Sequence, residues 1–89
     1  MRVEDVAIES DMVEMGLKGA DLLIYATVRA YEGDSGLRAS YRELSSMWGL
    51  SEAAVVRSVR RLEGRGVLWH VRNTVRHGAD AANIYRTAI

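Results

Sequence analysis

Helical spacing of apolar residues dominates the middle of the chain. The segment GADLLIYATVRAYE, residues 19–32, is apolar on more than one side and has no breaker after its first glycine, which predicts a helix buried against two neighbours or against a partner. The polar segment GDSG, residues 33–36, ends it. Residues 1–16 are less regular and are treated as an N-terminal extension: VEDVAI suits a short strand or a turn of helix, and DMVEM can begin a helix after Ser10.

The segment SYRELSSMWG carries the signals of a second helix, over residues 40–48. Ser40 and Glu43 have the spacing of a capping box, in which each side chain satisfies a free backbone amide at the helix start. Gly49 stands where such a helix ends, because glycine adopts the left-handed conformation at low cost. The pattern therefore predicts both ends of this helix.

A third helix is predicted over residues 51–64. Ser51 is a favourable N-cap residue, and only Gly49, Leu50 and Ser51 separate this helix from the preceding one. Two helices joined by a short turn that contains glycine are typical of a helix-turn-helix.

After Gly66 the apolar pattern changes to an alternating one. Val67, Trp69 and Val71 point to one side of an expected strand, and the run 83–88 can return antiparallel to it. We therefore expect a hairpin, the wing, over residues 67–88. The predicted fold is mainly α with a small antiparallel β hairpin: a winged helix-turn-helix with a three-helix core, formed as a single domain of residues 1–89.

The charge is unevenly distributed along a chain whose formal net charge is zero. Residues 1–34 carry eight acids and three bases, whereas residues 35–89 carry nine arginines and four acids. A bipolar domain can attract a polyanion with one end while its acidic end faces away or meets another protein.

The run 50–66, which contains the helix 51–64, holds four of these arginines. With about 100° per residue, Val55, Val59 and Leu62 form one stripe, which we expect to be buried. The residues on the opposite face combine two arginines with two small residues: Ala53, Arg57, Arg60 and Gly64. Such a face can approach another surface closely.

The four arginines separate into two pairs. Arg61 and Arg65 lie near the C-terminal end of the helix, where the helix dipole favours cations. Arg57 lacks that explanation, and Arg60 has only Glu63 as a candidate partner on the helix. A DNA phosphate backbone would account for both, and guanidinium groups also bind guanine edges.

The run SYRELSSMWGLSEAAVVRSVRRLEGRGVL resembles the recognition half of bacterial winged-helix regulators of the MarR and GntR type. The segment MGLKGADLLIYATVRAYE resembles the first helix of helix-turn-helix domains in phage, plasmid and mobile-element proteins, including replication-initiator-like ones. Ala54 and Val56 depart from the family pattern, which commonly has Thr and Ser there. The resemblance implies sequence-specific binding of double-stranded DNA by a bacterial or mobile-element transcriptional regulator.

The resemblance also implies roles for individual residues. Contacts with phosphate would come from the starts of the helices 40–48 and 51–64: Ser40, Tyr41, Arg42 and Ser51. Contacts with bases would come from the exposed side of the helix 51–64: Glu52, Ala53, Val56, Arg57 and Arg60. Arg61 belongs to the same DNA-binding surface. In the wing, Arg72, Arg76 and His77 can enter a minor groove or bind phosphate, or form a solvated hairpin tip.

Enzyme chemistry finds little support in the sequence. GDSG matches the nucleophile loop of chymotrypsin-like proteases, but Leu37 follows it and the chain is far smaller than that fold. His70, His77 and Asp80 share no metal-ligand spacing, and there is no cysteine. We expect no catalytic activity, no metal and no cofactor.

Two hypotheses remain for function. The first is a DNA-binding regulator, with a homodimer formed through the first helix and the N-terminal segment. The second is a winged-helix protein-interaction module or a replication-initiation accessory domain that does not read DNA directly. Because no long apolar run or signal segment is present, we expect a cytoplasmic protein with no membrane partner.

Overall fold

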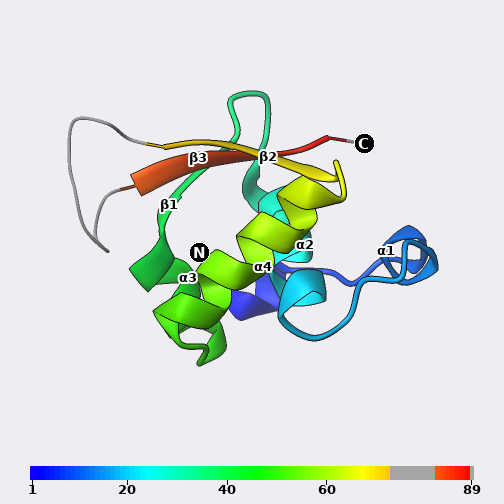
Figure 1. Cartoon of the computed structure of the whole chain (residues 1–89), viewed down its shortest axis with the longest axis horizontal. Coiled ribbons are helices and arrows are strands. Elements are labelled where there is room, and N and C mark those ends of the chain that lie inside the picture. The colour runs from blue at the N-terminus through cyan, green and yellow to red at the C-terminus, as the bar shows by residue number, and fades with distance from the viewer. Residues whose placement is uncertain (73–81, 89) are drawn as a thin grey trace.

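A three-stranded antiparallel sheet lies along one side of a group of helices (Figure 1). The computed structural model describes residues 1–72 and 82–88. Its elements are a 3-10 turn η1 (Val3–Asp5), α1 (Ser10–Glu14), α2 (Gly19–Tyr31), β1 (Leu37–Ser40), α3 (Tyr41–Trp48), α4 (Glu52–Gly64), β2 (Leu68–Val71) and β3 (Ala82–Thr87). The described chain is therefore an α plus β structure.

The capping signals place the ends of α3 and α4 as predicted. Ser40 Oγ accepts a hydrogen bond from the Glu43 amide at 3.0 Å, and Glu43 Oε1 accepts one from the Ser40 amide at 2.9 Å. Gly49 ends α3 in the left-handed region at φ 66°. Ser51 Oγ accepts from the Ala54 amide at 3.0 Å and begins α4. The turn between the two helices is thus fixed by residues that the sequence identifies.

The sheet contains one strand more than the predicted hairpin. β2 and β3 pair as expected, but β3 lies in the centre and β1 pairs with its other edge, from Leu37 opposite Tyr85 to Ser40 opposite Ala82. The mainly α prediction with a two-stranded hairpin is corrected accordingly. The four-residue segment LRAS is too short to show a strand period, and only pairing with β3 makes it a strand. The middle of the predicted wing, 73–81, lies outside the described residues.

The core lies between the inner face of the sheet and the helices. The stripe of α4 is buried as predicted, with Val55 and Leu62 fully inaccessible to solvent. α2 contributes Ile24 and Tyr25, and Tyr85 of β3 is fully buried against them in the same cluster. Burial raises the pKa of Tyr85 far above its ordinary value. α2 is therefore apolar on several sides because it contacts α1, α4 and β3 of its own chain.

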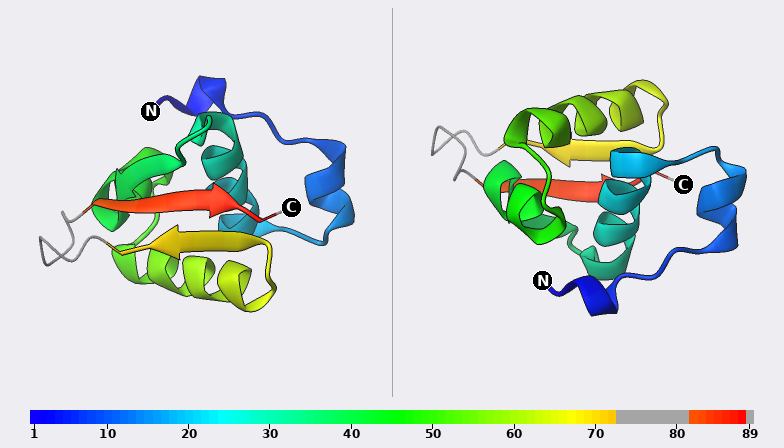
Figure 2. Two further views of the ribbon diagram at one scale, coloured as in Figure 1. Left: turned by 90° about the horizontal axis from the view of Figure 1, so that it is seen from above. Right: turned by 90° about the horizontal axis from the view of Figure 1, so that it is seen from below.

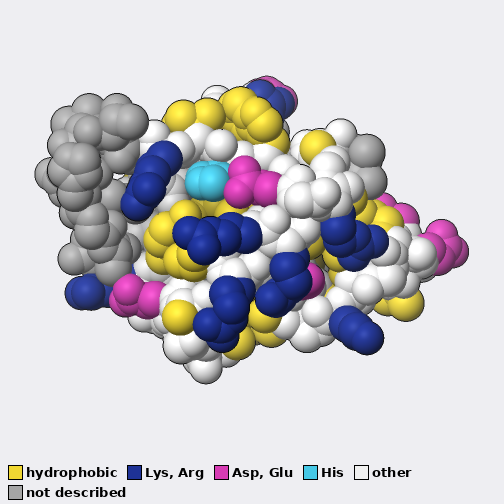
Figure 3. Space-filling view, in the orientation of Figure 1, with side chains coloured by type: hydrophobic (Ala, Val, Ile, Leu, Met, Phe, Trp, Pro, Cys, Tyr) yellow, Lys and Arg dark blue, Asp and Glu magenta, His cyan; other side chains and the backbone are white. Residues whose placement is uncertain are grey.

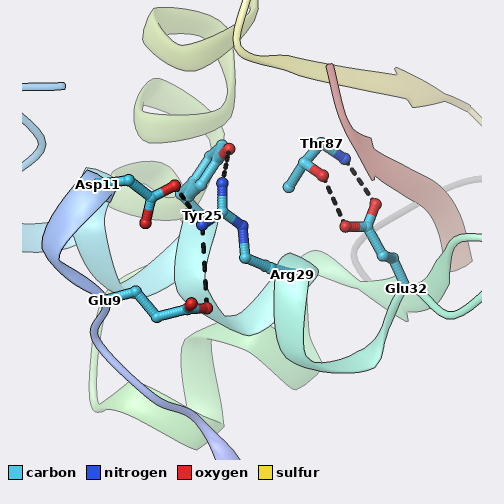
Figure 4. A network of polar contacts seen from close by, with 6 residues as sticks. All are labelled: Glu9, Asp11, Tyr25, Arg29, Glu32 and Thr87. Atoms are coloured by element: carbon cyan, nitrogen blue, oxygen red, sulfur yellow. Dashed lines mark hydrogen bonds and ion pairs between the residues drawn. The ribbon is translucent and has the colours of Figure 1, made fainter. Parts of the chain in front are cut away.

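The N-terminal extension folds onto α2 and contains helix rather than strand. Arg29 of α2 donates to Asp11 Oδ2 at 2.6 Å and to the Tyr25 hydroxyl at 2.7 Å, and lies 3.9 Å from Glu9 Oε1 (Figure 4). Met12 is fully buried. Arg29 and the buried Met12 thus hold α1 and the residue before it against the core.

A second polar contact shown in Figure 4 ties α2 to the sheet. Glu32 accepts from the Thr87 amide at 2.8 Å and from the Thr87 hydroxyl at 2.6 Å. It thereby holds the end of the central strand against the end of the first long helix.

Gly36 is required where the loop after α2 crosses β3. Its φ is +90°, and a Cβ there would lie 2.9 Å from the Tyr85 carbonyl oxygen and 2.8 Å from Ile84 Cγ2. We expect Gly36→Ala to lower the free energy of unfolding by about 2 kcal/mol or more, from backbone strain and from displacement of β3. Urea unfolding followed by circular dichroism measures this loss. Gly33→Ala is the control, because Gly33 also has a positive φ but a Cβ built there would meet no other residue within 4 Å. If both variants lost the same free energy of unfolding, the clash at Gly36 would contribute nothing.

Candidate nucleic-acid interface

α4 presents a polar side that no described element covers. Opposite its buried stripe lie four exposed residues, which we call the outer face of α4: Ala53, Arg57, Arg60 and Gly64. Figure 3 shows Lys and Arg side chains gathered over this part of the surface. The prediction from the helical period, with a buried side and an exposed arginine side, is confirmed.

Arg61 is held by α2 rather than by the helix dipole alone. Its Nη2 donates to Asp21 Oδ1 at 2.8 Å and its Nε lies 3.2 Å from both carboxylate oxygens of Asp21. Ser58 Oγ donates to the same carboxylate at 2.7 Å. Arg65, the next arginine on this side, donates to the Met15 carbonyl. These two arginines have structural partners, and Asp21 is a partner that no local sequence signal reveals, since it lies forty residues from Arg61.

Arg57 and Arg60 differ from Arg61 in having no such partner. Within residues 1–72 and 82–88, neither forms an ion pair or a side-chain hydrogen bond. Glu63, which the sequence offers to Arg60, instead has its Oε2 2.7 Å from Nδ1 of His70 on β2. The outer face of α4 therefore carries two exposed positive charges that this part of the fold does not neutralise.

The surroundings of the Asp21 carboxylate lower its pKa. Partial burial raises its pKa, but the hydrogen bonds from Arg61 and Ser58 and the charges of Arg61 and Arg65 outweigh burial, so the pKa of Asp21 lies below its ordinary value. A carboxyl whose pKa is lower when folded stabilises the protein above its unfolded pKa of about 4, and this contribution is lost as pH falls through the folded pKa.

We therefore expect Asp21→Asn to destabilise the protein at pH 7, by about 1 kcal/mol because Arg61 is half exposed to solvent. The difference from wild type should shrink below about pH 4, where the carboxyl of the unfolded wild-type chain begins to protonate and the folded state loses its advantage. Urea unfolding at pH 7 and pH 3 checks this. Asp34→Asn, a change of the exposed Asp34 after α2, is the control and should match wild type at both values. A destabilisation of Asp21→Asn that is equal at both pH values would contradict the assignment.

The residues expected at the start of α3 are only partly available. Ser40 is 3% exposed and its hydroxyl is used in the capping box, so its side chain offers no free group to a phosphate. Tyr41 is half-buried and packs against the core. Arg42 is exposed and lies 3.4 Å from Glu52 at the start of α4. Of these three residues, Arg42 alone presents a charged group to solvent.

The other predicted residues surround the outer face of α4 or lie beyond it. Ser51 is exposed, with its hydroxyl bonded to the Ala54 amide. Val56 is half-buried at the edge of the outer face. Arg72 is exposed directly after β2. Arg76 and His77 lie outside the described residues. The structure thus brings Arg42 beside Glu52 at the start of α4.

The described residues show neither a group placed to bind a metal nor a helix that could span a membrane. Residues 1–72 and 82–88 contain no group of three His, Cys, Asp or Glu side chains placed to hold a metal ion. In the same part of the chain, the helices are too short and too polar to cross a membrane. Comparison of the chain with models of known protein families and with curated proteins finds no match.

Proposed function

We propose that the chain is a winged helix-turn-helix domain that binds double-stranded DNA, with α4 as the helix that enters the major groove. The observation that carries this proposal is the exposure of Arg57 and Arg60 without a described acidic partner, on the face of α4 opposite its buried stripe. A neighbouring arginine of the same helix, Arg61, is paired with Asp21, so unpaired arginines are not a general property of α4.

The arrangement of elements supports the proposal. α3 and α4 are joined by a three-residue turn, and the hairpin of β2 and β3 follows α4 in the chain. In a helix-turn-helix the second helix contacts base edges while the first crosses the backbone. Arg42 on α3 and Arg72 after β2 would then meet phosphates on either side of the groove.

The chemistry of the outer face suits a DNA groove. Guanidinium groups bind phosphate strongly and bind guanine O6 and N7 with two hydrogen bonds. Ala53 and Gly64 flank the arginines with little bulk, which allows the helix backbone to approach the bases. Val56 at the edge can contact a thymine methyl group. Regulation of transcription in a bacterium or a mobile element is the role that this chemistry fits best.

The test is selection of bound duplexes from a random-sequence pool, followed by a salt titration of the selected site. Four arginines, Arg42, Arg57, Arg60 and Arg72, would each neutralise about one phosphate. We therefore expect log K to fall with log salt at a slope of about −3 to −4. No enrichment of any duplex, or binding that does not depend on salt, would overturn the proposal and favour a protein-interaction module.

A further inference from the structure

The side of the sheet that faces away from the helices carries apolar side chains on β2 and β3 beside arginines on β1 and β3. The register places Trp69 opposite Arg86, and Val71 and Arg38 on either side of Ile84. We call these five residues the outer sheet face. Trp69 is 50% exposed and Val71 47% exposed, although both lie in a strand whose other side is buried. Viewed from above, no described element covers β2 and β3 (Figure 2).

Beside Trp69 the surface is hollowed. A hollow of about 330 Å³ is lined by Trp69, Arg86, Thr87 and Ala88. It is large enough for a branched aliphatic side chain from a partner. Neither Arg38 nor Arg86 forms an ion pair within residues 1–72 and 82–88. Exposed aromatic and arginine side chains together are typical of protein interfaces.

The N-terminal segment has the complementary composition. Its exposed apolar side chains include Val3, Ile8 and Val13, which are 45%, 48% and 60% accessible to solvent. Residues 1–14 contain five acids, and Asp5 and Glu14 have no cationic partner in the described chain. Branched aliphatic residues beside carboxylates match a surface of Trp, Val and Ile beside arginines.

The N-terminal segment is held in place before any partner binds. Arg29 fixes Asp11, and the Tyr31 hydroxyl accepts from the Arg2 amide at 2.7 Å and donates to Asp5 Oδ2 at 2.9 Å. A surface fixed in this way loses little conformational entropy on association. Figures 1 and 2 show that the segment lies to the side of the helices, away from the outer sheet face, so the two surfaces do not meet within one chain.

We propose that the outer sheet face binds the N-terminal segment of a second copy of this chain. The apolar residues of the segment pack on Trp69, Val71 and Ile84, and its carboxylates pair with Arg38 and Arg86. Because two different surfaces meet, the contact is heterologous. A pair of bound copies still has one free sheet face and one free N-terminal segment, so further copies can add head to tail. DNA is the poorer occupant, since three of the five residues of this face are apolar. In addition, α4 lies on the other side of the sheet (Figure 1).

Sedimentation velocity of the full chain without DNA tests the proposal over a wide concentration series. We expect the average sedimentation coefficient of the wild-type protein to rise with concentration, and to rise less in high salt because the ion pairs are screened. A coefficient that stays that of a monomer at every concentration would overturn the proposal. The measurement is independent of DNA binding, so it fails or succeeds separately from the proposed function.

Two variants identify the contact. Trp69→Glu disrupts the outer sheet face, and the double variant Ile8→Glu with Val13→Glu disrupts the N-terminal segment. Each variant alone should remain monomeric. Their equimolar mixture retains one intact pair of surfaces and should form dimers but nothing larger. Self-association of either variant alone would contradict a head-to-tail contact and indicate a symmetric one. Loss of DNA binding by Trp69→Glu, with a monomeric wild type, would assign the face to DNA instead.

A pair of milder variants distinguishes loss of the contact from misfolding of the glutamate variants. Trp69→Ser and Ile8→Ser with Val13→Ser alter the same exposed positions without adding charge, and circular dichroism reports whether each is folded. Folded serine variants that associate as strongly as wild type would overturn the proposal.

Discussion

The double variant Arg57→Ala with Arg60→Ala is expected to bind its selected duplex about tenfold or more weakly than the wild type. Each arginine contact with a base edge contributes about 1–3 kcal/mol, and each phosphate contact also adds about one to the salt slope. The slope of log K against log salt should become shallower by about one for each of the two arginines that neutralises a phosphate, and by about two at most. Fluorescence anisotropy on a short duplex that accommodates one domain measures both quantities.

A matched control removes the same charge elsewhere. Arg38→Ala with Arg86→Ala deletes two exposed arginines from the outer sheet face, on a different side of the molecule. This control should keep the wild-type affinity and slope for a single domain. If both double variants lost affinity equally, general electrostatic attraction would explain binding and α4 would have no special role. Unchanged binding in the α4 variant would remove this helix from the interface.

The largest loss of stability is expected for Leu62→Ala, on the buried side of the same helix. Leu62 is fully inaccessible to solvent and packs in the cluster between α2, α4 and the sheet. Removing a buried leucine side chain costs about 2–5 kcal/mol through lost apolar burial and the cavity left behind. Because small domains are stable by only about 5–15 kcal/mol, we expect the Tm to fall by more than about 10 °C.

The Arg57 and Arg60 double variant is the control for this second prediction. It should unfold within about 0.5 kcal/mol of wild type, because exposed side chains without a described partner contribute little to stability. Thermal and urea unfolding of both variants compare the two sides of α4 directly. A loss for Leu62→Ala below about 1 kcal/mol would mean that this side of α4 is less tightly packed than its burial indicates.

Much of the fold was predictable because local signals agree with the tertiary structure. The Ser40 and Glu43 capping box, the left-handed Gly49 and the Ser51 cap each act within one turn of helix, so the residues that form them are adjacent in sequence. The buried stripe of α4 also follows from its own period. The strand β1 was not predictable, since four residues have no clear period and their pairing depends on β3, more than forty residues later.

The candidate site was predictable in its arginines and less so in its surroundings. The helical wheel separated Arg57 and Arg60 from Arg61 and Arg65, and the structure confirms that separation. The reason for the second pair differs from the one expected, because Arg61 is held by Asp21 of α2 and not by the helix end alone. Ser40 was assigned to a phosphate from a resemblance, whereas burial in the capping box removes its hydroxyl from the surface.

The sequence alone determined the three longer helices, where α3 and α4 begin, and which side of α4 faces outward, because caps and periodicity act over a few neighbouring residues. Tertiary structure alone decided which charges are neutralised and which surfaces stay open. Asp21 reaches Arg61 and Glu63 lies beside His70 only after helices and strands pack together. The same packing turns Trp69 and Val71 away from the core, because strand register, set by pairing with β3, chooses the buried side of β2.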